Sequence, residues 1–278
     1  MPRRIISQQW PATEHNISHR PVSADPTYAN VVFKHLGFDV EPIPTGEEER
    51  ADWKVTIGAF VMLVEEKLKL DDPEMLARRR AALYGGQVFP THVPIKPDNR
   101  LSGITSKAAT QIVATAPHMP HDIRIVWFTA AGHLHEPKQM QYLATLYGST
   151  NIFQLGQSRL KRCYFFRNSD FFRYRDTLDG AVVAEIVDQD ISARLCLNPL
   201  SPRYEKLKAS PLSTSFGTAI IEPLKEEADG DAYLIDCDLD RAKTNEVLQF
   251  LQTKYRVDKI MDMDMGFASA EVAVKAKG

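Results

Sequence analysis

The sequence predicts an α/β protein built around a mixed β-sheet, and three observations support this prediction. The stretch 123–130 (IRIVWFTA) is mostly apolar, which is typical of a strand buried on both faces of a parallel sheet. Strand-like and helix-like periodicities alternate through the first half of the chain. The chain of 278 residues contains 44% hydrophobic and 25% charged residues, enough to bury a substantial core.

Local composition predicts the individual elements. Strands are expected where aromatic, β-branched and other apolar residues gather between glycines, prolines or charged turns. The expected strands are 38–44, 53–58, 59–70, 123–130, 151–156, 161–168, 181–188 and 232–240. Helices are expected where apolar residues recur three and four positions apart. The expected helices are 27–37, 73–86, 102–116, 139–148 and 244–255.

Glycines, prolines and capping residues predict where these elements begin and end. Asp25 and Pro26 provide a cap and a first turn for the first helix, which Gly37 is expected to end. The second and third strands are expected to reverse direction near Gly58. The proline-rich stretch 87–97 is expected to form a loop, because proline cannot donate a backbone hydrogen bond to a sheet.

The chain is expected to divide into three regions. Residues 1–24 form an irregular N-terminal segment, residues 25–150 a core of helix, mixed β-sheet and helices, and residues 151–278 a C-terminal α/β extension packed on that core. No internal repeat or low-complexity linker separates the last two regions. This favours packing on a shared sheet over a freely hinged second domain.

Composition restricts the compartment and the kind of partner. Cys163, Cys196 and Cys237 lack the spacing of a zinc site or a disulfide framework, which favours a reducing, cytoplasmic setting. We expect a soluble protein with no membrane partner, since no apolar run approaches about 20 residues and the N-terminus does not look like a signal peptide. With a net charge of −2, binding of nucleic acid must depend on a local cluster of basic residues.

Three charged residues around the predicted hairpin form a candidate site. Asp52 precedes one strand, while Glu65 and Lys67 lie two apart near the end of its partner, so that both project from one face and Glu66 points away. The apolar run AFVMLV leads directly into these charges, unlike an ordinary alternating surface strand. Two carboxylates beside an ammonium group suit a divalent cation that activates water for phosphodiester hydrolysis.

The order of elements over 28–148, together with this D…ExK pattern, resembles the PD-(D/E)XK nuclease, or restriction-endonuclease-like, superfamily. The resemblance implies a restriction-endonuclease-like core and a metal-dependent nuclease acting on DNA, as a monomer or a homodimer. By this resemblance Asp52 and Glu65 would bind Mg²⁺ or Mn²⁺, and Lys67 would orient the attacking water. The sequence departs from the family pattern in having Ala51 before the aspartate and no glutamate in the first helix.

Two other interpretations stay open at this point. The three charged residues could form ordinary surface ion pairs on a solvated hairpin, each worth about 0–1 kcal/mol. Alternatively, the chain could keep the nuclease-like fold without activity and serve as a nucleic-acid- or protein-binding module. The absence of a glutamate from the first helix would suit this second interpretation.

Two further regions contain candidate site residues. Lys107 and Gln111 lie four apart on one face of the predicted helix 102–116, where related nucleases often carry such residues beside the phosphate, so Gln111 is a candidate catalytic residue. The segment 159–175 interleaves arginines with aromatic residues, a mixture that suits single-stranded nucleic acid. Its candidate DNA-binding residues, with Lys107, are Arg159, Arg162, Arg167, Arg173 and Arg175. An equally physical alternative is that the aromatic rings are buried while the arginines face water.

Overall fold

The computed structural model describes residues 8–11, 28–44, 49–187 and 190–273. Its strands are β1 (Gln8–Pro11), β2 (Asp39–Pro42), β3 (Trp53–Ile57), β4 (Phe60–Lys69), β5 (Phe89–Ile95), β6 (Ile123–Ala130), β7 (Thr150–Gln154), β8 (Lys161–Tyr164), β9 (Gly180–Val187), β10 (Asp190–Leu197), β11 (Ile220–Ile221), β12 (Ala232–Leu234), β13 (Ile260–Met263) and β14 (Met265–Glu271). Its helices are α1 (Tyr28–His35), α2 (Pro73–Tyr84), α3 (Asn99–Thr115), the short 3-10 helix η1 (Ala116–His118), α4 (His135–Tyr147), α5 (Asp170–Arg173), α6 (Tyr204–Lys208), α7 (Pro211–Phe216), α8 (Pro223–Ala228) and α9 (Thr244–Tyr255). Within the described ranges, none of these helices combines the length and apolar character needed to span a bilayer.

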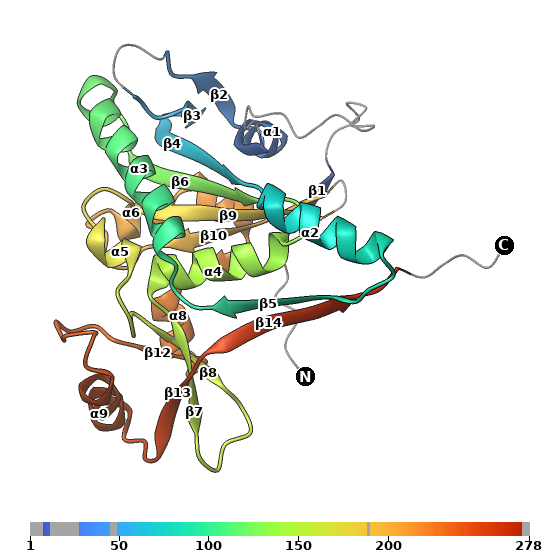
Figure 1. Cartoon of the computed structure of the whole chain (residues 1–278). Coiled ribbons are helices and arrows are strands. Elements are labelled where there is room, and N and C mark those ends of the chain that lie inside the picture. Colours follow the sequence, from blue (N-terminus) through green and yellow to red (C-terminus); the bar gives the residue numbers. More distant parts are fainter. Residues whose placement is uncertain (1–7, 12–27, 45–48, 188–189, 274–278) are drawn as a thin grey trace.

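A large mixed β-sheet organises the chain (Figure 1). Its strand order is β1-β10-β9-β6-β4-β3-β2, and β11 also pairs with β10. The central strands β4, β6 and β9 run parallel, whereas β3 and β10 run antiparallel to their central neighbours. The predicted α/β class with a mixed sheet is therefore confirmed, and Ile123–Ala130 is the buried parallel strand that its composition predicted.

Helices cover both faces of this sheet because its central strands are apolar on both sides. α3 and α4 pack on one face, and α1, α6 and α7 pack on the other (Figure 1). In β6, Phe128 stacks on Tyr142 of α4 with ring centroids 3.8 Å apart. The preceding residue, Trp127, packs edge to face on Phe33 of α1, with ring centroids 5.2 Å apart. Burying each such ring contributes about 1.5–3 kcal/mol.

The second half of the chain contributes to the same sheet as the first. β9 and β10 extend the large sheet beside β6, while β12, β8, β7 and β13 form a smaller sheet in that order. Tyr147, at the end of α4, joins the two regions: its hydroxyl donates to the carbonyl oxygen of Leu197 at 2.9 Å, and its ring packs edge to face on Tyr164 of β8. The C-terminal half is thus tied to the core through buried contacts.

The prediction of a loop at 87–97 was wrong. Residues 89–95 form β5, which pairs antiparallel with β14 from the far end of the chain. Pro90 and Pro94 occupy alternate, exposed positions of β5. β5 has a neighbour on one side only, so the missing N–H groups of its prolines can lie on the open edge without loss of a ladder bond. The partner strand lies about 175 residues away, which local sequence cannot reveal.

The predicted turns are present where the structure describes them. Gly58 has φ +57° in the tight reversal between β3 and β4, and α1 ends before Gly37. Gly148 ends α4 with φ +57°, and an added Cβ there would clash with the carbonyl oxygen of Arg167, so no larger residue fits. The cap expected at 25–26 lies outside the described residues.

Glu66 fastens α1 to the sheet on the face away from Glu65. One carboxylate oxygen accepts from the backbone N–H of Ala29, in the first turn of α1, and the other accepts from Trp53 Nε1, both at 2.9 Å. A helix N-terminus favours a negative charge at this position. Burial raises the pKa of the Glu66 carboxyl to about 7, although both hydrogen bonds favour the ionised form.

We predict that Glu66→Gln destabilises the fold by about 1–3 kcal/mol. One carboxylate oxygen, which accepts a hydrogen bond, would be replaced by an amide N–H₂ group, which cannot accept from Ala29 N or Trp53 Nε1. The measurement is urea unfolding near pH 8, where Glu66 is mostly ionised. Glu41→Gln is the matched control: Glu41 is exposed on β2 and pairs with Lys54, so its loss should cost only about 0–1 kcal/mol. Equal losses in the two variants would show that Glu66 does not anchor α1.

Candidate functional site

The end of β4 delivers Glu65 and Lys67 to the sheet face covered by α3. Because alternate residues of a strand share a face, Lys67 lies beside Glu65, and its ammonium group donates to Glu65 Oε1. The Glu65 side chain is fully buried, whereas that of Lys67 is 20% exposed. The site is therefore closed at its carboxylate and open to solvent on the lysine side.

Asp52 approaches the same point from the segment that precedes β3. Its Oδ2 accepts from the backbone N–H of Glu66 at 2.7 Å, and its carbonyl oxygen accepts from Ile43 N at 2.9 Å. These bonds hold the Asp52 carboxylate next to the end of β4, close enough to act electrostatically on Glu65. The structure thus brings together the two predicted carboxylates from the two arms of the hairpin.

Side chains of helix α3 form hydrogen bonds that hold Lys67 and the segment before Asp52 in place. Gln111 Oε1 accepts from Lys67 Nζ at 2.8 Å, and Gln111 Nε2 donates to the carbonyl oxygen of Arg50 at 3.2 Å. One turn further along, the Thr115 hydroxyl accepts from Ala51 N at 2.8 Å. A single face of α3 therefore positions both the ammonium group on β4 and the segment that carries Asp52.

The electrostatics of Glu65 are dominated by its burial. Burial raises the pKa of the Glu65 carboxyl to about 8, the neighbouring Asp52 carboxylate raises it further, and the Lys67 ammonium offsets part of this rise. Glu65 is consequently largely protonated at neutral pH in the absence of an additional cation. A pKa of this size for a carboxyl beside a second carboxylate is a frequent property of functional sites.

One oxygen of Glu65 has no partner within the described part of the chain. Oε2 is buried and makes no hydrogen bond, whereas Oε1 accepts from Lys67. When Glu65 is protonated, this carboxyl can share its proton with the Asp52 carboxylate; when Glu65 is ionised, Oε2 is a buried acceptor without a partner, which costs about 1–3 kcal/mol. Two adjacent carboxylates with a free oxygen fit the ligands that Mg²⁺ prefers, one or two carboxylates completed by water. Among the described residues, no group of three or more His, Cys, Asp or Glu side chains could hold a metal by itself.

The arginine-rich segment does not form an open stacking surface. Tyr164, Phe165, Phe166 and Phe171 are buried in the core, which agrees with the alternative interpretation of this segment. The arginines Arg159, Arg162 and Arg167 have partners within the chain, Asp231 at 3.0 Å, the Tyr164 hydroxyl at 3.2 Å, and Asp264 at 2.6 Å respectively. Arg159 and Arg167 are therefore engaged by carboxylates, whereas the one bond of Arg162 goes from Nη1 to a neutral hydroxyl.

The other predicted basic residues border α3. Arg173 is 57% exposed and donates to Ser102 Oγ of α3 at 3.2 Å. Arg175 is exposed and lies over the ring of Phe172. Lys107 is 57% exposed, one turn from Gln111, and pairs with Glu49 at 3.2 Å. Lys107 thus lies on α3, Arg173 contacts α3 through Ser102 and lies 3.9 Å from Asp170, and Arg175 follows α5 in the chain.

Sequence reasoning missed two contributors to the site. Thr115 and the carbonyl of Arg50 connect α3 to the Asp52 segment, but neither residue belongs to a charged motif. The position of Thr115, four residues after Gln111, places it on the same helical face and could have indicated its role. The Arg50 carbonyl gives no such indication, because every residue carries one.

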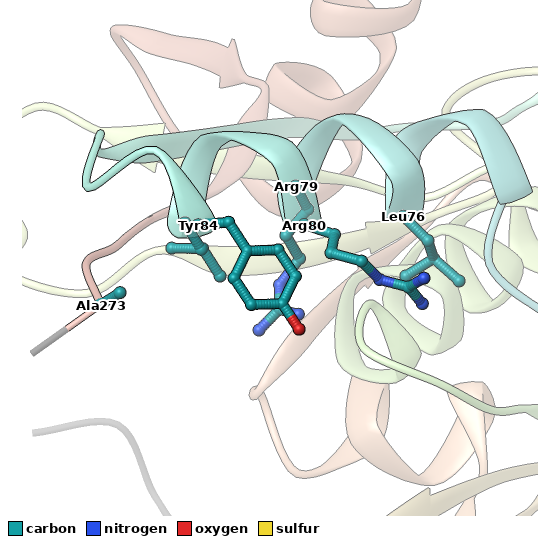
Figure 2. A pocket seen from close by; sticks show the side chains of 6 residues that line it. Leu76, Arg79, Arg80, Tyr84 and Ala273 are labelled. Carbon is teal, nitrogen blue, oxygen red and sulfur yellow. The ribbon is translucent and has the colours of Figure 1, made fainter. Parts of the chain in front are cut away.

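A hollow of about 350 Å³ lies beside α2, and neither Asp52 nor Glu65 lines it. Figure 2 shows the side chains along it. Arg80 and Tyr84 lie along it, and Tyr84 is 87% exposed. Arg79 pairs with Glu271 of β14, which joins α2 to the β5–β14 ribbon. No carboxylate lines this hollow, so it offers no ligand for a hard cation.

No family model, curated protein or solved structure matches this chain.

The Glu65 carboxyl should make the stability of the protein depend on pH. Its folded-state pKa of about 8 lies above the ordinary value of 4.5, so the folded state binds more protons than the unfolded state between these values. The free energy of unfolding should therefore be highest below pH 4.5 and should fall as the pH rises from 4.5 to about 8. We predict that Glu65→Gln reduces this fall by about 1–3 kcal/mol, leaving the part due to Glu66.

Urea unfolding of wild type and Glu65→Gln at a series of pH values in metal-free buffer would measure the effect. Glu41→Gln provides the control for removal of a carboxylate from an exposed position of the sheet. Parallel pH profiles for wild type and Glu65→Gln would contradict the raised pKa.

Proposed function

We propose that this protein is a divalent-metal-dependent nuclease that hydrolyses DNA phosphodiester bonds. The observation that carries the proposal is the convergence of Asp52, Glu65 and Lys67 on one sheet face, with a buried Glu65 oxygen that has no partner among the described residues. This arrangement supports a restriction-endonuclease-like core in the first half of the chain. A solvated hairpin with ordinary surface ion pairs is a poorer account, because Glu65 is fully buried.

Asp52 and Glu65 would hold Mg²⁺ or Mn²⁺. The bound cation would supply an activated water and neutralise charge on the scissile phosphate. It would also compensate the two adjacent carboxylates, so that Glu65 could ionise at neutral pH despite its burial.

The residues of the chain have distinct roles in this proposal. Lys67 is partly exposed and can place its ammonium group beside the phosphate and the attacking water, where negative charge develops. Gln111 fixes the direction of Lys67 by accepting from Nζ, and so acts as a positioning residue. Asp52 is held by the Glu66 N–H, which orients its carboxylate toward Glu65.

DNA would reach the site along the exposed side of α3. Ser102, which Arg173 contacts, lies nine positions before Gln111, and this corresponds to about 13.5 Å along the helix. Arg173 and Arg175 would therefore contact phosphates a few nucleotides from the scissile bond. The absence of an acidic side chain from the first turn of α1 leaves the two carboxylates as the proposed ligand set.

The central prediction is that purified protein nicks plasmid DNA or cuts single-stranded DNA with Mg²⁺ or Mn²⁺, and that EDTA stops the reaction. Asp52→Asn, Glu65→Gln and Lys67→Met should each lower the rate at least about 100-fold, because each removes a charge that acts on the transition state. Calorimetric titration with Mn²⁺ separates their roles. Binding should be lost in Asp52→Asn and Glu65→Gln and kept in Lys67→Met.

Lys54→Met is the matched control for this set, since Lys54 lies on the neighbouring strand β3 and pairs with exposed Glu41. Its rate should equal that of the wild type. Cleavage that survives all three site substitutions would come from a contaminant. No cleavage of either DNA, together with no Mn²⁺ binding that requires Glu65, would leave the inactive binding module as the better assignment.

DNA binding can be tested separately from cleavage. We predict that Arg173→Ala with Arg175→Ala weakens DNA binding and lowers the slope of log affinity against log salt by about 1 for each phosphate that is no longer neutralised. Arg159→Ala is the matched control, because its guanidinium is already paired with Asp231. Fluorescence anisotropy in Ca²⁺ or EDTA measures affinity without hydrolysis. Equal effects of the two variants would place the DNA elsewhere.

A further inference from the structure

A cavity of about 520 Å³ is lined mainly by α4, together with residues of β10 and of the smaller sheet. Its lining residues come mostly from α4, β5, β7, β8, β9 and β10, with one residue each from the end of β13 and the start of β14. Cavities that bind small molecules commonly measure about 300–1,000 Å³. None of the candidate nuclease residues Asp52, Glu65, Lys67 and Gln111 lines it.

Arg194 places a buried guanidinium group at this cavity, where burial lowers its pKa and the nearby Glu185 carboxylate offsets part of that fall. It projects from β10 on the same face as Val183, its neighbour in the sheet, and lines the cavity. Its Nε is buried and has no hydrogen-bond partner among the described residues. Glu185 also lines the cavity, but its carboxylate is held by His135 Nδ1 at 2.8 Å. A buried guanidinium N–H without an acceptor is costly, which points to an acceptor supplied from outside the chain.

Two further polar side chains, Gln139 and Arg162, present hydrogen-bond donors at the cavity. Gln139 is 3% exposed and lines the cavity from α4, yet its Nε2 has no hydrogen-bond partner in the described part of the chain. Arg162 lines the cavity from β8, and its Nη1 donates to the neutral Tyr164 hydroxyl at 3.2 Å. Two guanidinium groups and an amide N–H₂ thus offer donors to a ligand in the cavity. Guanidinium groups bind phosphate oxygens in pairs of parallel hydrogen bonds.

The remaining wall of the cavity is apolar and adaptable. Met140, Leu143, Met263 and Met265 line it, together with the ring of Tyr147. Methionine thioethers pack favourably on aromatic rings and adjust to their shape. Asn151, opposite Arg162 in the register of β7 and β8, adds a side chain that can both donate and accept. The cavity therefore offers one cationic end and one apolar end suited to a flat ring.

We propose that this cavity binds a nucleoside monophosphate, with its phosphate on Arg194 and Arg162, a polar atom on Gln139, and its base against the methionine-lined wall. This site is independent of the nuclease proposal, because the carboxylates of that site do not line it and its occupation requires no cleavage. Helix α4 connects the cavity to the strand that carries Glu65 and Lys67. Gln139 lines the cavity, and the preceding residue, Lys138, forms an ion pair with Asp71, two residues beyond the end of β4.

Isothermal titration calorimetry of the full chain with AMP, GMP, CMP and UMP tests this proposal, with inorganic phosphate and adenosine as the partial ligands. At least one nucleotide should bind at least about tenfold more tightly than either partial ligand. Arg194→Met and Gln139→Leu should each weaken that binding, the first at least about tenfold. Arg80→Met, an exposed arginine on α2, is the matched control and should leave the affinity unchanged.

Thermal unfolding distinguishes loss of binding from loss of fold. Because the buried Nε of Arg194 has no hydrogen-bond partner among the described residues, Arg194→Met should melt at the wild-type temperature or above it while no longer binding the nucleotide. The proposal is overturned if no nucleotide binds, if phosphate or adenosine alone binds as tightly as the nucleotide, or if Arg194→Met binds as well as the wild type.

Discussion

Two consecutive carboxyl groups, Glu65 and Glu66, are buried on opposite faces of one central strand, and the architecture depends on how each is accommodated. Desolvation raises the pKa of both. On the Glu66 side, the N-terminus of α1 and the Trp53 indole supply two donors, so this acid becomes an anchor between helix and sheet. The buried charge thereby determines where α1 begins on the sheet.

On the other face, the cost of burying the Glu65 carboxyl is only partly offset by its contacts within the described part of the chain. Glu65 receives one ammonium group, lies beside a second carboxylate and keeps one oxygen unpaired. Such a group costs stability, and the proposed metal site would account for its presence. At the cavity, the buried Nε of Arg194 likewise has no hydrogen-bond partner among the described residues. These are the two places at which we propose that a ligand binds.

Much of the first half of the fold could be predicted because its information is local. The apolar run at β6, the glycine positions and the periodicity of α2, α3 and α4 all depend on residues close together in sequence. The β5–β14 ribbon and the strand β10 could not be predicted. β5 contains prolines that favour a loop locally, and β10 shows no clear alternation of buried and exposed residues. Their pairing is decided by partners distant in the chain or by burial.

For the candidate site, the sequence by itself determined that Glu65 and Lys67 share a face and that Glu66 does not, because the period of a strand is two. It also placed Lys107 and Gln111 on one side of a helix. Only the tertiary structure decided that this helix covers this strand, that Gln111 meets Lys67, and that most of the arginine-rich segment is engaged internally. The physical reason is that burial and the distance between elements are properties of packing, and no spacing within a single element specifies them.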